Sequence, residues 1–169
     1  MKTNHLILTA TIFFMTMALA ACSDSEQKTM GTPPVTAPKE VKSFFETYLP
    51  PMSYGYDETP FNFGINDLNN TKYFLINSME EFKAIAPSSL ELPTIDFDKY
   101  TLIIGGHLLG SPKYTLMKQT VHKETAEISL NLIYQQMNGA SPTIITTFYF
   151  WGLYTKLTNK TIKVDVTTI

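Results

Sequence analysis

Arginine is absent from this chain of 169 residues, and cysteine occurs only once. Arginine grips phosphate and carboxylate groups through paired hydrogen bonds, so its absence weakens a nucleotide-binding interpretation. The abundance of Thr, Ile, Asn and Lys is also consistent with a plain compositional bias. The formal net charge of −2 provides no basic face for nucleic acid. We therefore expect no nucleic-acid partner.

The single cysteine, Cys22, leaves the chain unable to form an internal disulfide. The stability of the domain must therefore come from packing. Long apolar runs are also missing after residue 22, because no segment approaches the roughly 20 apolar residues of a transmembrane helix. Any attachment to a membrane is expected to lie at the N-terminus.

The first 22 residues have the pattern of an export signal. Lys2 precedes an apolar run over residues 6–17 that is too short to span a bilayer comfortably, and the run leads into Leu19-Ala20-Ala21-Cys22. This ending resembles a bacterial lipobox, where the cysteine is acylated and the chain is cut before it. We predict a lipoprotein signal peptide over 1–21 and lipidation of Cys22. The alternative is an ordinary thiol after a signal peptide.

Residues 22–38 are polar and rich in proline, which predicts a flexible tether. The tether begins Ser23-Asp24-Ser25-Glu26, which resembles the acidic signal that directs some bacterial lipoproteins to the cell surface. A simple solvated linker explains the same residues. We expect a lipid anchor in the outer membrane, with the domain facing either the cell surface or the periplasm.

Residues 39–169 are predicted to form a single globular α+β domain with two short helices. Val41, Phe44, Phe45 and Tyr48 share one face of a helix that Pro50 would end. The second helix, over 79–86, begins with a capping box. In this box Ser78 is the N-cap and Glu81 is the third helical residue.

The rest of the domain predicts a mostly antiparallel sheet of five to six strands. Expected strands cover 71–77, 100–109, 114–121, 126–134, 143–151 and 162–167, and a turn is expected over 122–125. The continuous apolar run over 100–109 predicts a central strand buried on both faces, with a bulge or close approach at Gly105 and Gly106. The strict alternation over 126–134 predicts one buried and one solvated face.

An aromatic segment interrupted by glycine and proline lies between the first helix and the first long strand. Its members are Tyr54, Tyr56, Phe61 and Phe63. One interpretation is a binding surface, because tyrosine and phenylalanine supply a large contact area at low entropic cost. The other is a loop pinned to the core by its aromatic rings.

Catalytic and metal-binding patterns are weak. His107 stands inside the most apolar strand, where a core histidine with one satisfied nitrogen is expected. Asp96 and Asp98 flank Phe97, but a hard cation needs six or more oxygen ligands, so we expect them to cap a turn. The chain has no Gly-x-Ser-x-Gly elbow and no Gly-rich phosphate loop. We predict no enzyme activity, no metal and no cofactor. A hydrolase would need Asp96 or Asp98 beside His107 in a cleft.

The segment from Phe74 to about Tyr154 resembles the small domain of the protease-complex-stability protein B family of bacterial lipoproteins. The resemblance rests on Asn77-Ser78-Met79-Glu80-Glu81-Phe82 after a strand, and on Ile95-Asp96-Phe97-Asp98-Lys99-Tyr100 before an apolar strand. The family typically has a Gly-Gly-Tyr turn where this chain has Gly110-Ser111-Pro112-Lys113-Tyr114. The resemblance implies a non-enzymatic domain that associates with other envelope proteins.

These observations predict a membrane-anchored envelope lipoprotein that acts as a non-catalytic protein-interaction module. The expected partners are the membrane, through the N-terminal lipid, and another envelope protein. The alternative is a surface lipoprotein that binds a carbohydrate or small ligand. Its binding residues would be Tyr54, Tyr56, Phe61, Phe63 and Trp151.

Overall fold

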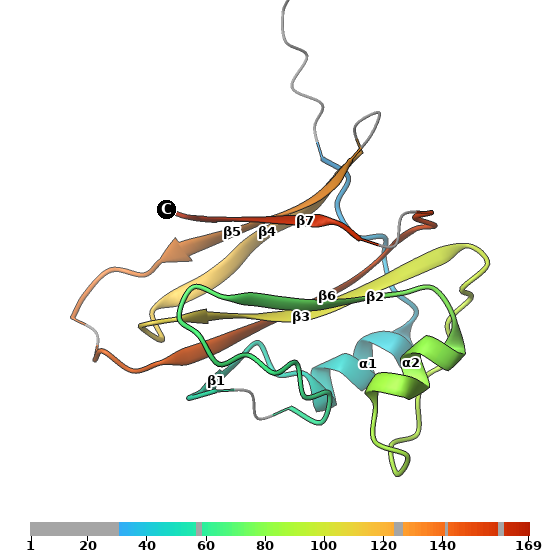
Figure 1. Ribbon diagram of the computed structural model, residues 1–169. Coiled ribbons are helices and arrows are strands. Elements are labelled where there is room, and N and C mark those ends of the chain that lie inside the picture. Colours follow the sequence, from blue (N-terminus) through green and yellow to red (C-terminus); the bar gives the residue numbers. More distant parts are fainter. Residues whose placement is uncertain (1–30, 57–58, 124–126, 141, 159–160) are drawn as a thin grey trace, which may run out of the picture.

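The computed structural model describes residues 31–56, 59–123, 127–140, 142–158 and 161–169. The predicted signal peptide, Cys22 and the first part of the predicted tether lie outside these residues. Figure 1 shows three layers: two helices, a sheet beneath which they pack, and a second sheet on the far face of the first. No helix among the described residues is long and apolar enough to cross a bilayer.

The described residues form two helices and seven strands in these layers. In chain order they are α1 Lys39–Tyr48, β1 Met52–Tyr54, β2 Thr71–Ile76, α2 Met79–Ile85, β3 Tyr100–Leu109, β4 Tyr114–Lys123, β5 Ile128–Gln136, β6 Thr146–Thr155 and β7 Lys163–Thr168. The first sheet has the order β1-β6-β3-β2, and the second has the order β4-β5-β7. All neighbours are antiparallel except β5 and β7.

The α+β class and the two short helices are confirmed. The strands, however, are divided between two sheets rather than joined in one sheet of five or six. The division follows from burial. β3 and β6 are covered on both faces, by the helices on one side and by the second sheet on the other, so almost all of their residues are buried. β5 alternates between buried and partly exposed residues because its outer face meets solvent.

The two helices start and stop where their flanking residues predict. Pro38 precedes α1, and Val41, Phe44 and Phe45 are buried beneath the first sheet, whereas Tyr48 is 39% exposed. In α2 the Ser78 hydroxyl accepts a hydrogen bond from the Glu81 amide. The Glu81 carboxylate accepts one from the amide of Asn77, at 2.6 Å. This reciprocal cap fixes the helix start.

β3 runs in unbroken register with both neighbours through Gly105 and Gly106. The glycines therefore mark the close approach and not the bulge. A side chain at Gly105 would collide with the Lys72 carbonyl and the Phe150 ring. The bulge in the fold lies in β4, between Leu116 and Lys118. Pairing of β4 with β5 continues as far as Lys123, so His122 and Lys123 belong to the strand and not to the predicted turn.

The end of the predicted tether lies against the domain. Residues 31–37, here called the strap, form one isolated bridge from Thr32 to Val121 of β4 and another from Val35 to Leu153 of β6. Thr32 and Val121 exchange two backbone hydrogen bonds of 2.8 Å, and the Val35 amide donates to the Leu153 carbonyl at 2.7 Å. The strap therefore joins β4, an edge strand of the second sheet, to the part of β6 in the first sheet that lies beyond its pairing with β1.

Candidate functional site

An apolar cleft of about 620 Å³ opens where the edges of the two sheets meet. α1 and β1 supply part of one wall, β4 supplies the other, and β6 forms the floor. The lining residues are Glu46, Leu49, Pro51, Met52, Pro112, Tyr114, Thr115, Leu116, Gln119, Met137, Phe148, Tyr149, Phe150 and Trp151. Most of these side chains are apolar or aromatic, as is typical of a recognition site.

The floor of the cleft follows from the period of a strand. Phe148 and Phe150 are two residues apart, so both point from β6 toward the second sheet, where they are buried. Tyr114 of β4 meets Phe148 edge to face, with ring centroids 6.2 Å apart. The two sheets thus touch through rings at the bottom of the cleft and separate above them.

The strap and the cleft share one seam between β4 and β6. At roughly 3.3 Å per extended residue, the step from Thr32 to Val35 spans about 10 Å, the usual distance between packed sheets. The strap uses this length to cross from Val121 to Leu153. It closes one end of the seam, and the cleft is the part that it leaves open.

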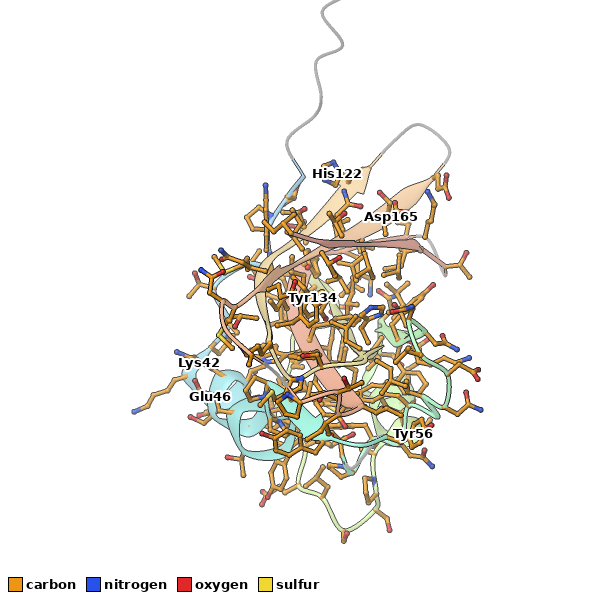
Figure 2. The ribbon with its side chains drawn as sticks, turned by 90° about the vertical axis from the view of Figure 1, so that its left-hand side faces the viewer. Lys42, Glu46, Tyr56, His122, Tyr134 and Asp165 are labelled. Carbon is orange, nitrogen blue, oxygen red and sulfur yellow. The ribbon has the colours of Figure 1, made fainter. Side chains whose placement is uncertain are left out.

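Few polar groups reach the cleft. Glu46 stands at its edge and pairs with Lys42 at 3.6 Å, and both side chains are more than half exposed. Figure 2 shows this pair on the outer surface of α1. Deeper in the seam, the Gln119 Nε2 atom and the Tyr154 hydroxyl are buried and have no hydrogen-bond partner among the described residues, and burial raises the pKa of Tyr154. The cleft therefore offers apolar contact with little charge.

The predicted aromatic segment is divided by the fold. Phe61 and Phe63 are only 2% and 6% exposed and pack in the core beneath the first sheet. They cannot form a binding surface, because Phe61 contacts the rings of Phe44, Phe45 and Phe82.

The two tyrosines of the segment remain accessible, at 57% for Tyr54 and 50% for Tyr56. Tyr54 lies two residues beyond Met52 of the cleft wall, on the same side of β1. Figure 2 places Tyr56 across the molecule from Lys42 and Glu46. Neither tyrosine lines the cleft. Tyr54 is thus a rim residue, and Tyr56 is a separate exposed ring.

His107 is a core residue, as its position predicts. It is 3% exposed, its Nδ1 atom lies 2.7 Å from the Thr71 hydroxyl, and its ring stacks on Tyr134 at a centroid distance of 5.7 Å. Burial lowers its pKa, and a hydrogen bond with the Asn70 backbone opposes this shift. The imidazole is therefore held neutral within the protein.

Asp96 and Asp98 lie at the opposite end of β3. The Asp96 carbonyl accepts hydrogen bonds from the amides of Lys99 and Tyr100, and its carboxylate pairs with the Lys99 ammonium at 2.8 Å. This hydrogen bond lowers the pKa of Asp96. Along β3, roughly 23 Å of strand separates Tyr100 from His107, so the arrangement required for a hydrolase is not formed. Within the described part of the chain, His, Cys, Asp and Glu gather nowhere in a group that could hold a metal.

Sequence reasoning did not find the cleft. Its walls come from segments that are far apart in the chain, such as Glu46, Leu116 and Trp151. One available signal was the aromatic density of 146–155, which exceeds what a strand with one buried face requires. The sequence places Trp151 only among the aromatic residues of the alternative carbohydrate- or small-ligand-binding site.

Comparison of the chain with models of protein families, with curated proteins and with solved structures gives no match.

Proposed function

We propose that this protein is an outer-membrane lipoprotein, anchored through Cys22, whose domain binds another envelope protein without catalysing a reaction. The observation that carries the proposal is the apolar cleft left open in the seam between the two sheets. Concave sites lined mainly by apolar and aromatic side chains are the usual form of binding sites in proteins. The strap, which leads from the proposed anchor, closes only the other end of the seam.

The composition of the cleft favours a protein partner. Tyr114, Phe148 and Trp151 all line the cleft, and aromatic residues commonly dominate the binding energy of protein interfaces. Exposed Met137 on the β5–β6 loop adds a side chain that can adapt its shape to a partner. The exposed Ile144 and Ile145 belong to the same loop.

The proposal of a non-catalytic role rests on how the polar groups are used. His107 is buried in a hydrogen bond and a ring stack, while Asp96 is bound to Lys99 at the far end of β3. The resemblance of residues 74–154 to the protease-complex-stability protein B family favours the same role. We extend that family's association with envelope proteins to this chain as part of the proposal.

A small apolar ligand is the second candidate, because the cleft volume falls within the usual range for small-molecule sites. The aromatic platform expected for a carbohydrate receives less support. Phe61 and Phe63 are buried, and one face of Trp151 is covered by Phe45.

Photo-crosslinking in native cells tests the proposed function. A photo-reactive residue replaces Thr115, an exposed residue of the cleft wall, and in a control it replaces Thr168 at the far edge of the second sheet. We expect one discrete envelope protein to be crosslinked from position 115 and not from 168. Adding Met137→Glu should abolish this product, whereas Ile169→Glu should not. Crosslinks that are identical from both positions would contradict the proposal.

A further inference from the structure

β4 is an edge strand, and most of its outer edge lies open beside the cleft. It pairs only with β5 in the second sheet, and the strap is bridged to its outer edge at Val121. In an antiparallel strand, residues two apart direct their backbone groups to the same edge. Because Val121 bonds outward to Thr32, the backbone N–H and C=O of Gln119 face outward too. Among the described residues, no backbone group bonds Gln119 at this edge.

The strap already shows how an extended segment is held here. Thr32 exchanges two backbone hydrogen bonds with Val121, as a residue of an added strand would. The cleft continues from that point along the same edge, through Gln119 and Leu116 to Tyr114. A segment placed beside β4 would therefore extend an interface that the strap begins, and its inward side chains would enter the apolar cleft.

The outer face of β4 favours an acidic side chain on an added strand. Lys118 is exposed and lies opposite Ile133 of β5, and it forms no ion pair with a described residue. On this face β5 offers only the uncharged Ser129, Asn131, Ile133 and Gln135. A carboxylate on an added strand beside Lys118 would supply the opposite charge that β5 does not.

Lysines and bulges are devices by which edge strands avoid indiscriminate pairing. Here the bulge lies between Leu116 and Lys118, so it breaks the regular edge near its middle. A long strand of arbitrary sequence could not pair along the whole edge. A short segment with the right side chains can still bond on either side of the bulge. The edge of β4 can therefore pair with a short matching segment but not with a long strand of arbitrary sequence.

We infer that the free edge of β4 binds a short extended segment of the partner by strand addition. Apolar side chains at alternate positions of the segment enter the cleft, and an acidic side chain on its other face pairs with Lys118. The inference rests on the proposed function, since it specifies how the cleft engages a protein. It identifies the partner's chemistry as an exposed strand or tail in which apolar and acidic residues alternate.

Selection from a displayed library of random nonapeptides tests the inference on the full chain. The protein is captured through a C-terminal tag, which lies at the β7 edge away from the cleft. Peptides retained by the wild type and by Ile169→Glu, but not by Met137→Glu, are sequenced. Both substituted residues are more than half exposed, so the fold should be kept. We expect apolar residues at every second position and Asp or Glu between them.

The best peptide is then synthesised in three forms, and the fluorescence of Trp151 reports binding. Methylation of alternate backbone nitrogens should weaken binding by about tenfold or more, because strand addition needs those donors. Exchange of its acidic residue for lysine should weaken binding about threefold, and Lys118→Glu should restore it. Lys72→Glu, on β2 of the other sheet, should not.

Three results would overturn the inference: no peptide specific to the cleft, apolar residues at helical spacing, or equal affinity of the methylated peptide. If the crosslink from position 115 persisted in any of these cases, the proposed function would stand and only strand addition would fail. Loss of the crosslink together with a successful selection would instead overturn the proposed function while leaving an edge that binds extended peptides.

Discussion

The Phe45 ring of α1 stacks on the indole of Trp151 in β6, with ring centroids 4.4 Å apart and ring planes inclined by 22°. This contact fastens the helix layer to the first sheet. Trp151 also lines the cleft, so a single side chain touches both the core and the candidate site. As the only tryptophan in the chain, it reports on both by its fluorescence.

Phe45→Leu should lower the free energy of unfolding by about 1–2 kcal/mol and shift the emission of Trp151 to longer wavelength. The substitution removes a ring stack and loosens the cover over the indole. Tyr48→Leu on the same helix is the control, since Tyr48 is 39% exposed and contacts Phe44 rather than Trp151. Unchanged emission in Phe45→Leu would contradict the prediction.

The division of the aromatic segment predicts opposite results for two of its members. Phe61→Ala should lower the free energy of unfolding by about 3–5 kcal/mol, because it empties a site in the core. Tyr54→Ala should change it by less than about 0.5 kcal/mol, since Tyr54 is 57% exposed. Denaturant unfolding of both variants measures the difference. Comparable losses in the two variants would show that the segment acts as one unit.

Local signals made much of the fold predictable. Ser78 and Glu81 carry a capping box that needs no information from elsewhere in the chain, and α2 begins there. The apolar run of β3 likewise predicts, without information from other segments, that the strand is buried on both faces. The division into two sheets was not predictable in the same way. It depends on which face of β6 meets β4, and no short pattern records that pairing.

The strap is a second feature that could not be predicted from the sequence. By composition, residues 31–37 carry too little apolar surface to order themselves, and a tether was expected. Their order comes from backbone hydrogen bonds to Val121 and Leu153, which lie in two different sheets. Backbone groups are the same in every sequence, so composition does not reveal that this segment binds to the two strands. The cleft beside the strap was hidden for the same reason.

The hydroxyls of Tyr134 and Tyr73 should respond differently to deletion. The Tyr134 hydroxyl is buried and has no hydrogen-bond partner among the described residues. Tyr134→Phe should therefore leave the free energy of unfolding unchanged or raise it by up to about 1 kcal/mol. The hydroxyl of Tyr73 donates to the Ile162 carbonyl at 2.6 Å, so Tyr73→Phe should cost about 1–2 kcal/mol. Equal losses in the two variants, measured by chemical denaturation, would contradict this difference.

His107 should make stability depend on pH in the mildly acidic range. Burial lowers its pKa in the folded protein, so the unfolded chain binds the proton more readily. Its effect is absent above the unfolded value of about 6.5, and stability falls as the pH decreases below it, by at most about 1.4 kcal/mol per pH unit. The pKa values of the carboxylates Glu80 and Asp96 are also lowered in the folded protein. Their stabilising contribution is therefore lost only as the pH falls below about 4.5.

The test follows the free energy of unfolding from pH 8 to pH 5 in the wild type and in His107→Gln. The wild type should lose stability over the lower half of this range, and the variant should lose less. The variant is less stable throughout, because it gives up the stack on Tyr134, so the slope and not the level is compared. Parallel curves would exclude His107 as the source of the pH dependence.

Replacing Cys22 tests the predicted anchor, from which the strap would lead into the seam. Cys22→Ser should abolish metabolic labelling with a fatty-acid analogue, because serine lacks the thiol that is acylated. It should also leave the signal peptide uncleaved or poorly processed. More than one acyl chain is needed for stable membrane attachment, so any processed variant should appear in the soluble fraction. Labelling of the variant equal to that of the wild type would rule out lipidation at this residue, and the strap would then lead to no lipid anchor at Cys22.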